Sequence, residues 1–586
     1  MVGLWHRPPA AGYLKKVLQA SSSAQSPRAA KSVHSDGDRT TSRGTLPPVN
    51  DRPRAPSEAP SQSAPHPLLA GLAALSDTRL VLLVAAVLFA LAAWPLLLVP
   101  LPPFQDLPNH LATAHIVAHP DLYPQFAFNG LFKSNCLLTL WFYLVGDHGL
   151  FGAARAFTAI VLGATAIALP LFVLHFAGRR AVPVAMLFVW PLVHSFSVSM
   201  GFLNFTFAFA LSLILLTVLD RQRERPTPAG GFGIAALSSV VWYAHPFPLA
   251  VVGALVALHA ATRPTWRDRI DAGVALLLPL VPAGLLSVVA AQQHLIKAEN
   301  SSAAAATFRY LPPWEIVTHL WRDVSGAFTW WGGATIVPAI LLPCFAWAQR
   351  RAPRPLLSTT ALAVLIVAYV GLPEMLSNWN YLNTRLVPFL WAGLALRLPT
   401  TLPRPAAILL AVCALSFSAA EGVDYVRLDR DRAEFTAGIE AVPAGATLLP
   451  LLFKHGKTSH FTASLSHAWG YYTVARDTSA PLVFGVERSY PITYREFPPR
   501  KLIPPALDTF AVQYGTPAGV CKALSQAPVD AACTAAWREL WAGFWREATP
   551  RFNHLLTWAI PPEARPMIPD VYHRVFTAGE LEIYAR

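Results

Sequence analysis

The stretch "LLLVPLPPFQDLPNHLATAHIVAHP", residues 96–120, decides how the chain divides between membrane and solvent. A long apolar segment ends here, and Pro102 and Pro103 stop it because proline cannot continue a helix. Asp106 and three histidines follow directly. They lie in a segment that predicts a short helix with Pro108 in its first turn, where proline is tolerated. The side of the membrane on which these polar residues lie therefore decides what they can do.

The composition places most of the chain in lipid. Of 586 residues, 54% are hydrophobic and only 13% are charged, whereas soluble domains carry about 25% charge. Apolar stretches near the ~20 residues needed to cross a bilayer recur along the chain. The net charge of +13 is spread over short loops and the N-terminus, without a basic patch that interleaves with aromatics, so nucleic-acid binding is not expected. The composition predicts an all-α polytopic membrane protein.

The first part of the chain has a different character. Residues 1–66 are rich in Ser, Pro, Ala and Arg and show almost no apolar periodicity, which predicts a disordered basic tail. The tail is not a signal peptide, because the first apolar run begins only near Leu80. Residues 67–420 form the predicted transmembrane module, and residues 421–586 form a separate domain.

The arginines orient the predicted spans. Five loops between the spans carry two or three arginines each: "AGRRA", "DRQRERP", "TRPTWRDRID", "AQRRAPRP" and "LRLPTTLPRP". With a cytoplasmic N-terminus, all five loops lie on the cytoplasmic side, as the positive-inside rule demands. Eleven apolar segments are the predicted spans: 80–101, 152–177, 182–199, 201–220, 232–247, 248–262, 272–292, 328–348, 357–376, 386–398 and 405–420.

The same rule settles one ambiguous segment. Residues 134–148, "SNCLLTLWFYLVGDH", are apolar, but a span here would move every later arginine loop to the outside. We therefore expect a helix at the outer membrane interface, within a long first external loop at residues 102–151. Asp106 and the histidines lie at the start of this loop.

An odd number of spans places residues 421–586 outside, where we expect a small α/β domain. Four segments read as strands, "ATLLPLLF", "APLVFGV", "DTFAVQYG" and "ELEIYAR", and "TAAWRELWAGFWREA" reads as an amphipathic helix. Cys521 and Cys533 lie in this domain, and in an oxidising compartment they are able to close a disulfide.

Polar residues near the spans gather at the outer end of the predicted bundle. Because such groups are costly at membrane depth, they tend to face cavities and mark function. Their placement predicts a cavity that opens at the outer leaflet, with Asp106 above it. These residues are His194, Asn204, His245, Glu374, Asn380 and Arg385.

Each of these residues also has a purely structural interpretation. Asp106 is suited to capping its helix, and His194 and His245 to hydrogen-bonded packing. Asn204 is suited to fixing an interhelical contact, and Arg385 to extending towards the interface. His115 and His119, spaced i and i+4, show no nearby third metal ligand in the sequence.

The order of these features resembles the GT-C class of membrane glycosyltransferases. A first span, an external loop bearing the acid of "QDLPNHLA", many further spans and an external C-terminal domain follow one another. The segments "GFLNF", "HPF", "YLNTRLVPF" and "SHAWGYYTVAR" are also similar to parts of uncharacterised bacterial members. Where the class usually carries a second acid beside the first, Leu107 stands here. This departure leaves open whether a divalent cation is a cofactor.

The resemblance implies a polyprenyl-phosphate-linked sugar as donor and a glycan, lipid or protein as acceptor. The protein is then expected in the bacterial inner membrane, in cell-envelope synthesis, with its C-terminal domain in the periplasm. Asp106 is the expected general base, and His110 orients it or shares its proton. Arg385 is expected to hold the leaving phosphate. The alternative is a non-catalytic transporter, flippase or surface-polysaccharide assembly protein.

Overall fold

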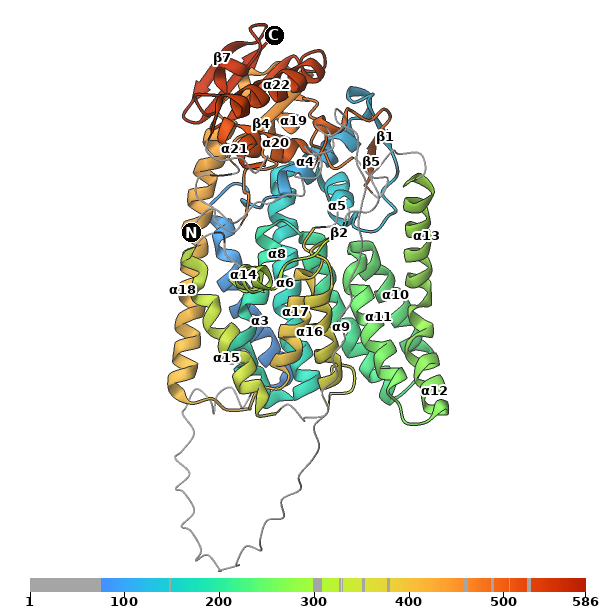
Figure 1. Ribbon diagram of the computed structural model, residues 1–586. Coiled ribbons are helices and arrows are strands. Elements are labelled where there is room, and N and C mark those ends of the chain that lie inside the picture. Colours follow the sequence, from blue (N-terminus) through green and yellow to red (C-terminus); the bar gives the residue numbers. More distant parts are fainter. Residues whose placement is uncertain are drawn as a thin grey trace, which may run out of the picture.

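The computed structural model describes residues 75–146, 149–298, 308–325, 328, 330–349, 354–376, 380–454, 456, 462–485, 490–504, 506–523 and 529–586. The chain is a mostly helical membrane protein. Figure 1 shows a bundle of helices with a mixed α/β domain against one end, and the last part of the chain builds that domain. The tail predicted at residues 1–66 lies outside the described residues.

Long apolar helices form the bundle, and their outer faces are as apolar as their packed faces. The first of them, α3, buries Leu80 and Leu88 against the bundle, whereas Leu82 and Val87 are more than half exposed. Such all-round apolarity is typical of helices that contact lipid. The bundle helices are α3 Asp77–Ala93, α6 Leu150–Ala177, α7 Val182–Val189, α8 Phe196–Ser199, α9 Leu203–Glu224, α10 Pro228–Ala244, α11 Pro246–Ala261, α12 Trp266–Leu276, α13 Val281–Ala298, α15 Ile336–Trp347, α16 Thr359–Gly371, α17 Val387–Ala395 and α18 Arg404–Thr436.

Six helical stretches in the described ranges are long and apolar enough to cross a membrane. Three shorter apolar helices accompany them. The count of eleven spans therefore stays a prediction. The six stretches are Asp77–Leu97, Leu150–Ala177, Arg179–Ser199, Leu203–Glu224, Trp266–Ala290 and Arg404–Ala441, and the shorter helices are Pro246–Ala261, Gly333–Trp347 and Thr359–Gly371.

The chain between α3 and α6, predicted as the first external loop, contains α4 Leu107–Ala118, β1 Phe126–Phe128 and α5 Leu137–Val145. The nine residues of α5 are too few for a span, and α5 packs against α4 and α6. Strand β1 pairs antiparallel with β5, Ile492–Tyr494, which belongs to the C-terminal domain. The loop that carries Asp106 is thus joined to that domain by backbone hydrogen bonds.

A second region outside the bundle helices is built from two stretches of chain. The first, between α13 and α15, holds β2 Phe308–Arg309 and α14 Pro313–Ser325, and the second, after α16, holds β3 Met375–Leu376, which pairs antiparallel with β2. The 3-10 helix η8, Thr384–Leu386, then leads into α17. The predicted residues Glu374 and Arg385 both lie in the second stretch.

The C-terminal domain has a four-stranded sheet in the order β4-β6-β8-β7. Strands β4 Leu448–Leu452 and β6 His554–Trp558 are parallel, and β8 Leu581–Ala585 is antiparallel to both β6 and β7 His573–Ala578. The predicted amphipathic helix is α22, Ala531–Ala548, which buries Trp541 and Phe544. The domain is α/β, but the predicted boundary at residue 420 falls inside α18, which continues to Thr436.

Two of the four predicted strands are wrong. Residues 508–515, "DTFAVQYG", lie in helix α20, Ala506–Tyr514, because the buried side chains Leu507, Phe510, Ala511 and Tyr514 recur at helical spacing. Residues 480–486 form turns and irregular chain where they are described. Cys521, in α21 Pro517–Ala523, and Cys533 form a disulfide with Cα atoms 5.4 Å apart.

Candidate functional site

Asp106 stands at the N-terminal end of α4 and is held there by its backbone. Its N–H donates to the carbonyl of Met200, 3.0 Å away, in the turn between α8 and α9. The approach is close: a Cβ on Gly201, which has φ +87°, would lie 3.0 Å from the nitrogen of Asp106. Glycine is needed here both for the positive φ and for the space.

The Asp106 side chain makes no hydrogen bond to the first turn of α4. A capping aspartate accepts a bond from the N–H two or three residues ahead. Asp530 does this at the start of α22, where its carboxylate accepts from the N–H of Cys533 at 2.7 Å. The Asp106 carboxylate therefore does not cap its helix, which was the structural interpretation of this residue.

An imidazole from the C-terminal domain lies beside Asp106. His467 Nε2 is 3.5 Å from Asp106 Oδ1, and His467 Nδ1 is 3.4 Å from the amide nitrogen of Asn109 in α4. The segment that carries His467 packs tightly on α4, since a Cβ on Gly470 would collide with the carbonyl of Pro108. The sequence pattern predicted His110 for this position.

His110 is directed elsewhere. Its ring lies edge-on to Phe484, with ring centroids 5.6 Å apart. His110 and Asp106 are both within the described residues, and they form no ion pair with each other. Burial lowers the pKa of His110 to about 4. The ring is therefore neutral at pH 7. The partner of the carboxylate is His467.

Burial raises the pKa of Asp106 to about 7. The positive charge of Arg385 lowers it, the negative charge of Asp508 in α20 raises it, and a hydrogen bond from Gln105 lowers it. Burial also raises the pKa of Asp508 to about 7. A carboxylate with a pKa near neutrality is suited to general acid–base catalysis.

Arg385 lies in η8 and is buried. Its Nη1 is 2.5 Å from His245 Nε2, and its Nη2 donates to the main-chain carbonyl of Asn380 at 3.5 Å. The guanidinium also lies over the rings of Phe202, at 4.9 Å, and Phe205, at 5.4 Å. His245 and Arg385, both predicted to lie at the same end of the bundle, are thus in contact. Asn380 contributes its main-chain carbonyl.

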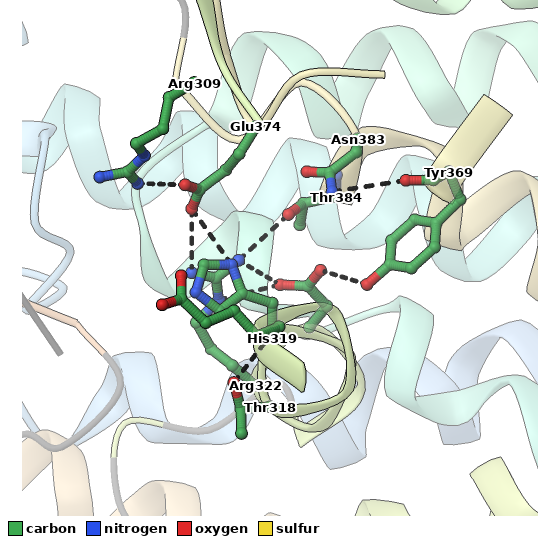
Figure 2. Close-up of polar contacts among 10 residues, drawn as sticks. Arg309, Thr318, His319, Arg322, Tyr369, Glu374, Asn383 and Thr384 are labelled. Carbon is green, nitrogen blue, oxygen red and sulfur yellow. Dashed lines mark hydrogen bonds and ion pairs between the residues drawn. The ribbon is translucent and has the colours of Figure 1, made fainter. Parts of the chain in front are cut away.

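Glu374 is the centre of a charged cluster, shown in Figure 2. It forms ion pairs with Arg309, with His319 at 3.2 Å and with Arg322 at 3.7 Å. Burial acts to raise the pKa of Glu374, but His319 and the two arginines outweigh it and hold that pKa at about 2. Glu374 is therefore ionised, and its interactions are with protein cations.

The cluster extends to α16 and η8. Arg322 Nε and Nη2 donate to Asp323 Oδ1 at 2.9 and 2.7 Å, and Nη2 also donates to the Thr384 hydroxyl at 3.2 Å. The hydroxyl of Tyr369 donates to Asp323 Oδ2 at 3.4 Å. Thr384 precedes Arg385 in η8, so the bond from Arg322 to Thr384 fixes the short helix that presents the Arg385 guanidinium.

Tyr381 joins the cluster to Arg385. The Arg322 guanidinium lies 4.7 Å above the Tyr381 ring, and that ring packs against Phe202, which also contacts Arg385. Burial is the main cause that raises the pKa of Tyr381, and the negative charges of Glu374 and Asp106 raise it further, so Asp106 and Tyr381 lie within electrostatic range. Arg322, Tyr381, Arg385 and Asp106 consequently occupy one region.

Two predicted residues lie in other surroundings. His194 Nε2 is 3.1 Å from the hydroxyl of Tyr425 and 3.5 Å from Glu421, both in α18. Asn204 accepts from the N–H of Leu138 at 2.9 Å and donates to Asn135, which ties α9 to the start of α5. A part for either residue in substrate binding stays a prediction.

Sequence reasoning missed three members of the region: His467, Asp508 and Arg322. His467 does lie in "SHAWGYYTVAR", a segment that carried the resemblance.

His115 pairs with Asp477 at 2.7 Å. Within the described ranges, no three His, Cys, Asp or Glu side chains are grouped to hold a metal ion.

No family model and no curated protein matches this chain. Among solved structures, it is similar to the arabinofuranosyltransferase AftD from mycobacteria, with a TM-score of 0.44 and 15% sequence identity. The similarity covers 88% of this chain and 40% of that protein. The chain thus spans less than half the length of the structure it matches.

Proposed function

We propose that this protein is a membrane glycosyltransferase. It moves a sugar from a polyprenyl-phosphate donor to an acceptor hydroxyl at the external face, with inversion at the sugar carbon. The observation that carries this proposal is the Asp106 carboxylate, which has a pKa of about 7 and takes no part in capping its helix. A carboxylate kept near neutrality by burial costs stability, and functional sites are where such groups are found.

Asp106 acts as the general base. As the acceptor oxygen attacks the sugar carbon, its proton passes to an Asp106 oxygen, and the bond between that carbon and the phosphate oxygen breaks. The electron pair of this bond leaves with the phosphate. His467, whose Nε2 lies 3.5 Å from Asp106 Oδ1, orients the carboxylate and shares the change in its charge when the carboxylate takes up the proton.

Arg385 holds the leaving phosphate. A guanidinium stays charged when it is buried and presents several N–H donors to phosphate oxygens. Phe202, Phe205 and His245 keep that guanidinium in place from three sides. Because Arg385 also lowers the pKa of Asp106, the base and the phosphate site are within electrostatic range of each other, as one transfer reaction requires.

A transporter of lipid-linked sugars is a second candidate, and one observation favours it. Glu421 lies buried in α18 beside His194 and Tyr425. Ionisable groups inside a membrane often mark ion or substrate pathways. Transport would give movement of labelled donor across a proteoliposome membrane without release of polyprenyl phosphate.

The test uses the purified full chain in proteoliposomes with a panel of radiolabelled polyprenyl-phosphate sugars. Release of polyprenyl phosphate and labelling of an acceptor are measured. Asp106→Asn should lower transfer by about 10²–10⁴-fold, because an amide takes no proton at neutral pH.

The matched control is Asp530→Asn, which alters an aspartate that does cap its helix. This variant should transfer sugar normally. Near-normal transfer by well-folded Asp106→Asn would show that Asp106 is not the base. Absence of transfer from every donor by the wild-type protein, together with donor movement, would favour the transporter.

A further inference from the structure

A groove opens on the surface of the bundle, away from the charged region, between α3 and the start of α6. Its volume is about 560 Å³. We propose that this groove binds an anionic phospholipid of the outer leaflet, with one acyl chain along its apolar wall and the phosphate at Arg155. Residues that form the wall include Phe89, Ala93, Leu97, Gly152, Ala156 and Ala159.

The groove exists because, apart from Arg155, the face of α6 that lines it carries only small side chains. Gly152, Ala156 and Ala159 follow one another at helical spacing, so no bulky apolar side chain of α6 fills the space beside α3. Leu97, on the opposite wall, is 79% exposed. An exposed apolar channel at the surface of a membrane helix bundle is covered by lipid chains, since the alternative is contact with water.

The far wall of the groove is rigid. The indole N–H of Trp94 donates to the Ser418 hydroxyl at 2.7 Å, and that hydroxyl donates to the carbonyl of Leu91 at 2.7 Å. The Trp94 ring also lies against Gly422 of α18, where any side chain would collide with it. A fixed wall reduces the conformational entropy that is lost when a lipid binds. This favours a lipid that stays bound over one that exchanges freely with the bilayer.

Arg155 is the one charged residue among those lining the groove. Within the described part of the chain, its side chain forms no ion pair or hydrogen bond. A cation among apolar side chains at membrane depth is costly, and a phosphate provides the complementary charge. The residue lies in the second turn of α6, near the outer end of that helix, where outer-leaflet head groups are found.

The groove is distinct from the proposed transfer site. Asp106, Arg385 and His467 are not among the residues that line the groove. A phosphate bound at Arg155 therefore lies outside the proposed transfer site. This separation is why we assign the groove to a phospholipid and not to the donor.

The rim of the groove touches the joint with the external domain. Phe151, in the first turn of α6, packs edge-on against Tyr471 of α19, with centroids 6.2 Å apart. Gly470, the neighbour of Tyr471, lies so close to α4 that a Cβ on it would collide with the carbonyl of Pro108. A lipid at this rim supports the contacts of α4, the helix that begins directly after Asp106.

The experiment is native mass spectrometry of the full chain, delipidated in neutral detergent and then incubated with phosphatidylglycerol, phosphatidylcholine or polyprenyl phosphate. We expect one phosphatidylglycerol to be retained. Arg155→Gln should weaken this binding about tenfold, which equals about 1.4 kcal/mol. Ala156→Trp fills the channel and should abolish it.

Two matched controls keep the result interpretable. Arg180→Gln removes an exposed arginine at the other end of α6, and Ile167→Trp adds bulk to a lipid-facing position outside the groove. Both should bind like the wild type. Equal retention by Arg155→Gln or by Ala156→Trp, or preferential retention of polyprenyl phosphate, would overturn the proposal. Because no sugar transfer is measured, failure here leaves the glycosyltransferase proposal untouched.

Discussion

The rate of sugar transfer should rise with pH through neutrality, because Asp106 works as a base only when it is ionised. With a pKa of about 7, its ionised fraction is about one tenth at pH 6, about half at pH 7 and about nine tenths at pH 8. The rate should therefore increase about tenfold from pH 6 to pH 8. A carboxylate with its ordinary pKa of 3.8 would be ionised throughout, and the rate would be flat over this range.

The assay is the initial rate of polyprenyl-phosphate release at low donor concentration, so that the profile reports the free protein. Asp508→Asn removes a negative charge that raises the pKa of Asp106. The midpoint of the profile should consequently move to lower pH. Replacing Arg385 by Gln removes a charge that lowers this pKa, so the midpoint should move to higher pH.

A second readout is independent of activity. Because burial raises the pKa of folded Asp106 above its unfolded value, the site favours the neutral form, and the stability that this form contributes is lost as pH rises towards 7. Asp106→Asn mimics the neutral form, so its Tm should exceed that of the wild type at pH 8. The difference should shrink towards pH 4. A flat rate profile, or a lower Tm for the variant at pH 8, would refute the reasoning.

Further outcomes are expected from other positions. Arg385→Ala should lower transfer by about 10²–10³-fold, and Arg385→Lys should lower it less, because a positive charge remains for the phosphate; comparison of kcat values checks this. Gly201→Ala should destabilise the protein by about 1–2 kcal/mol, because its φ is left-handed and its Cβ would press on Asp106, as thermal unfolding would show. Cys521→Ser, which opens the disulfide to Cys533, should lower the stability of the external domain by about 3 kcal/mol, measured by unfolding without reductant. A reporter that is active only outside the cytoplasm should be active when fused to the C-terminus, and an inactive but inserted fusion would contradict the topology.

The sequence was sufficient to find Asp106, because two prolines and a change from apolar to polar residues mark a helix boundary locally. It was also sufficient to place Arg385 and His245 at the same end of the bundle, since the arginine loops orient the spans. Both inferences depend on patterns within a few tens of residues, where helix periodicity and loop charge act directly.

The rest of the site depends on contacts between distant segments. His467 reaches Asp106 from more than 350 positions along the chain, and no local pattern distinguishes it from His110. Asp508 was hidden because its segment read as a strand, whereas its buried residues have helical spacing. Arg322 lies on α14, and only its contacts with Glu374, Thr384 and Tyr381, which are distant in the sequence, reveal that it belongs to this region.

The pairing of β1 with β5 limits how this protein can be rearranged. The loop between α3 and α6 and the C-terminal domain share a strand pair, and the domain supplies the imidazole at Asp106. The domain is therefore not an interchangeable module. Grafting a foreign domain after α18 would remove one strand of the pair and a partner of the carboxylate together, so loop and domain can only be exchanged between relatives as one unit.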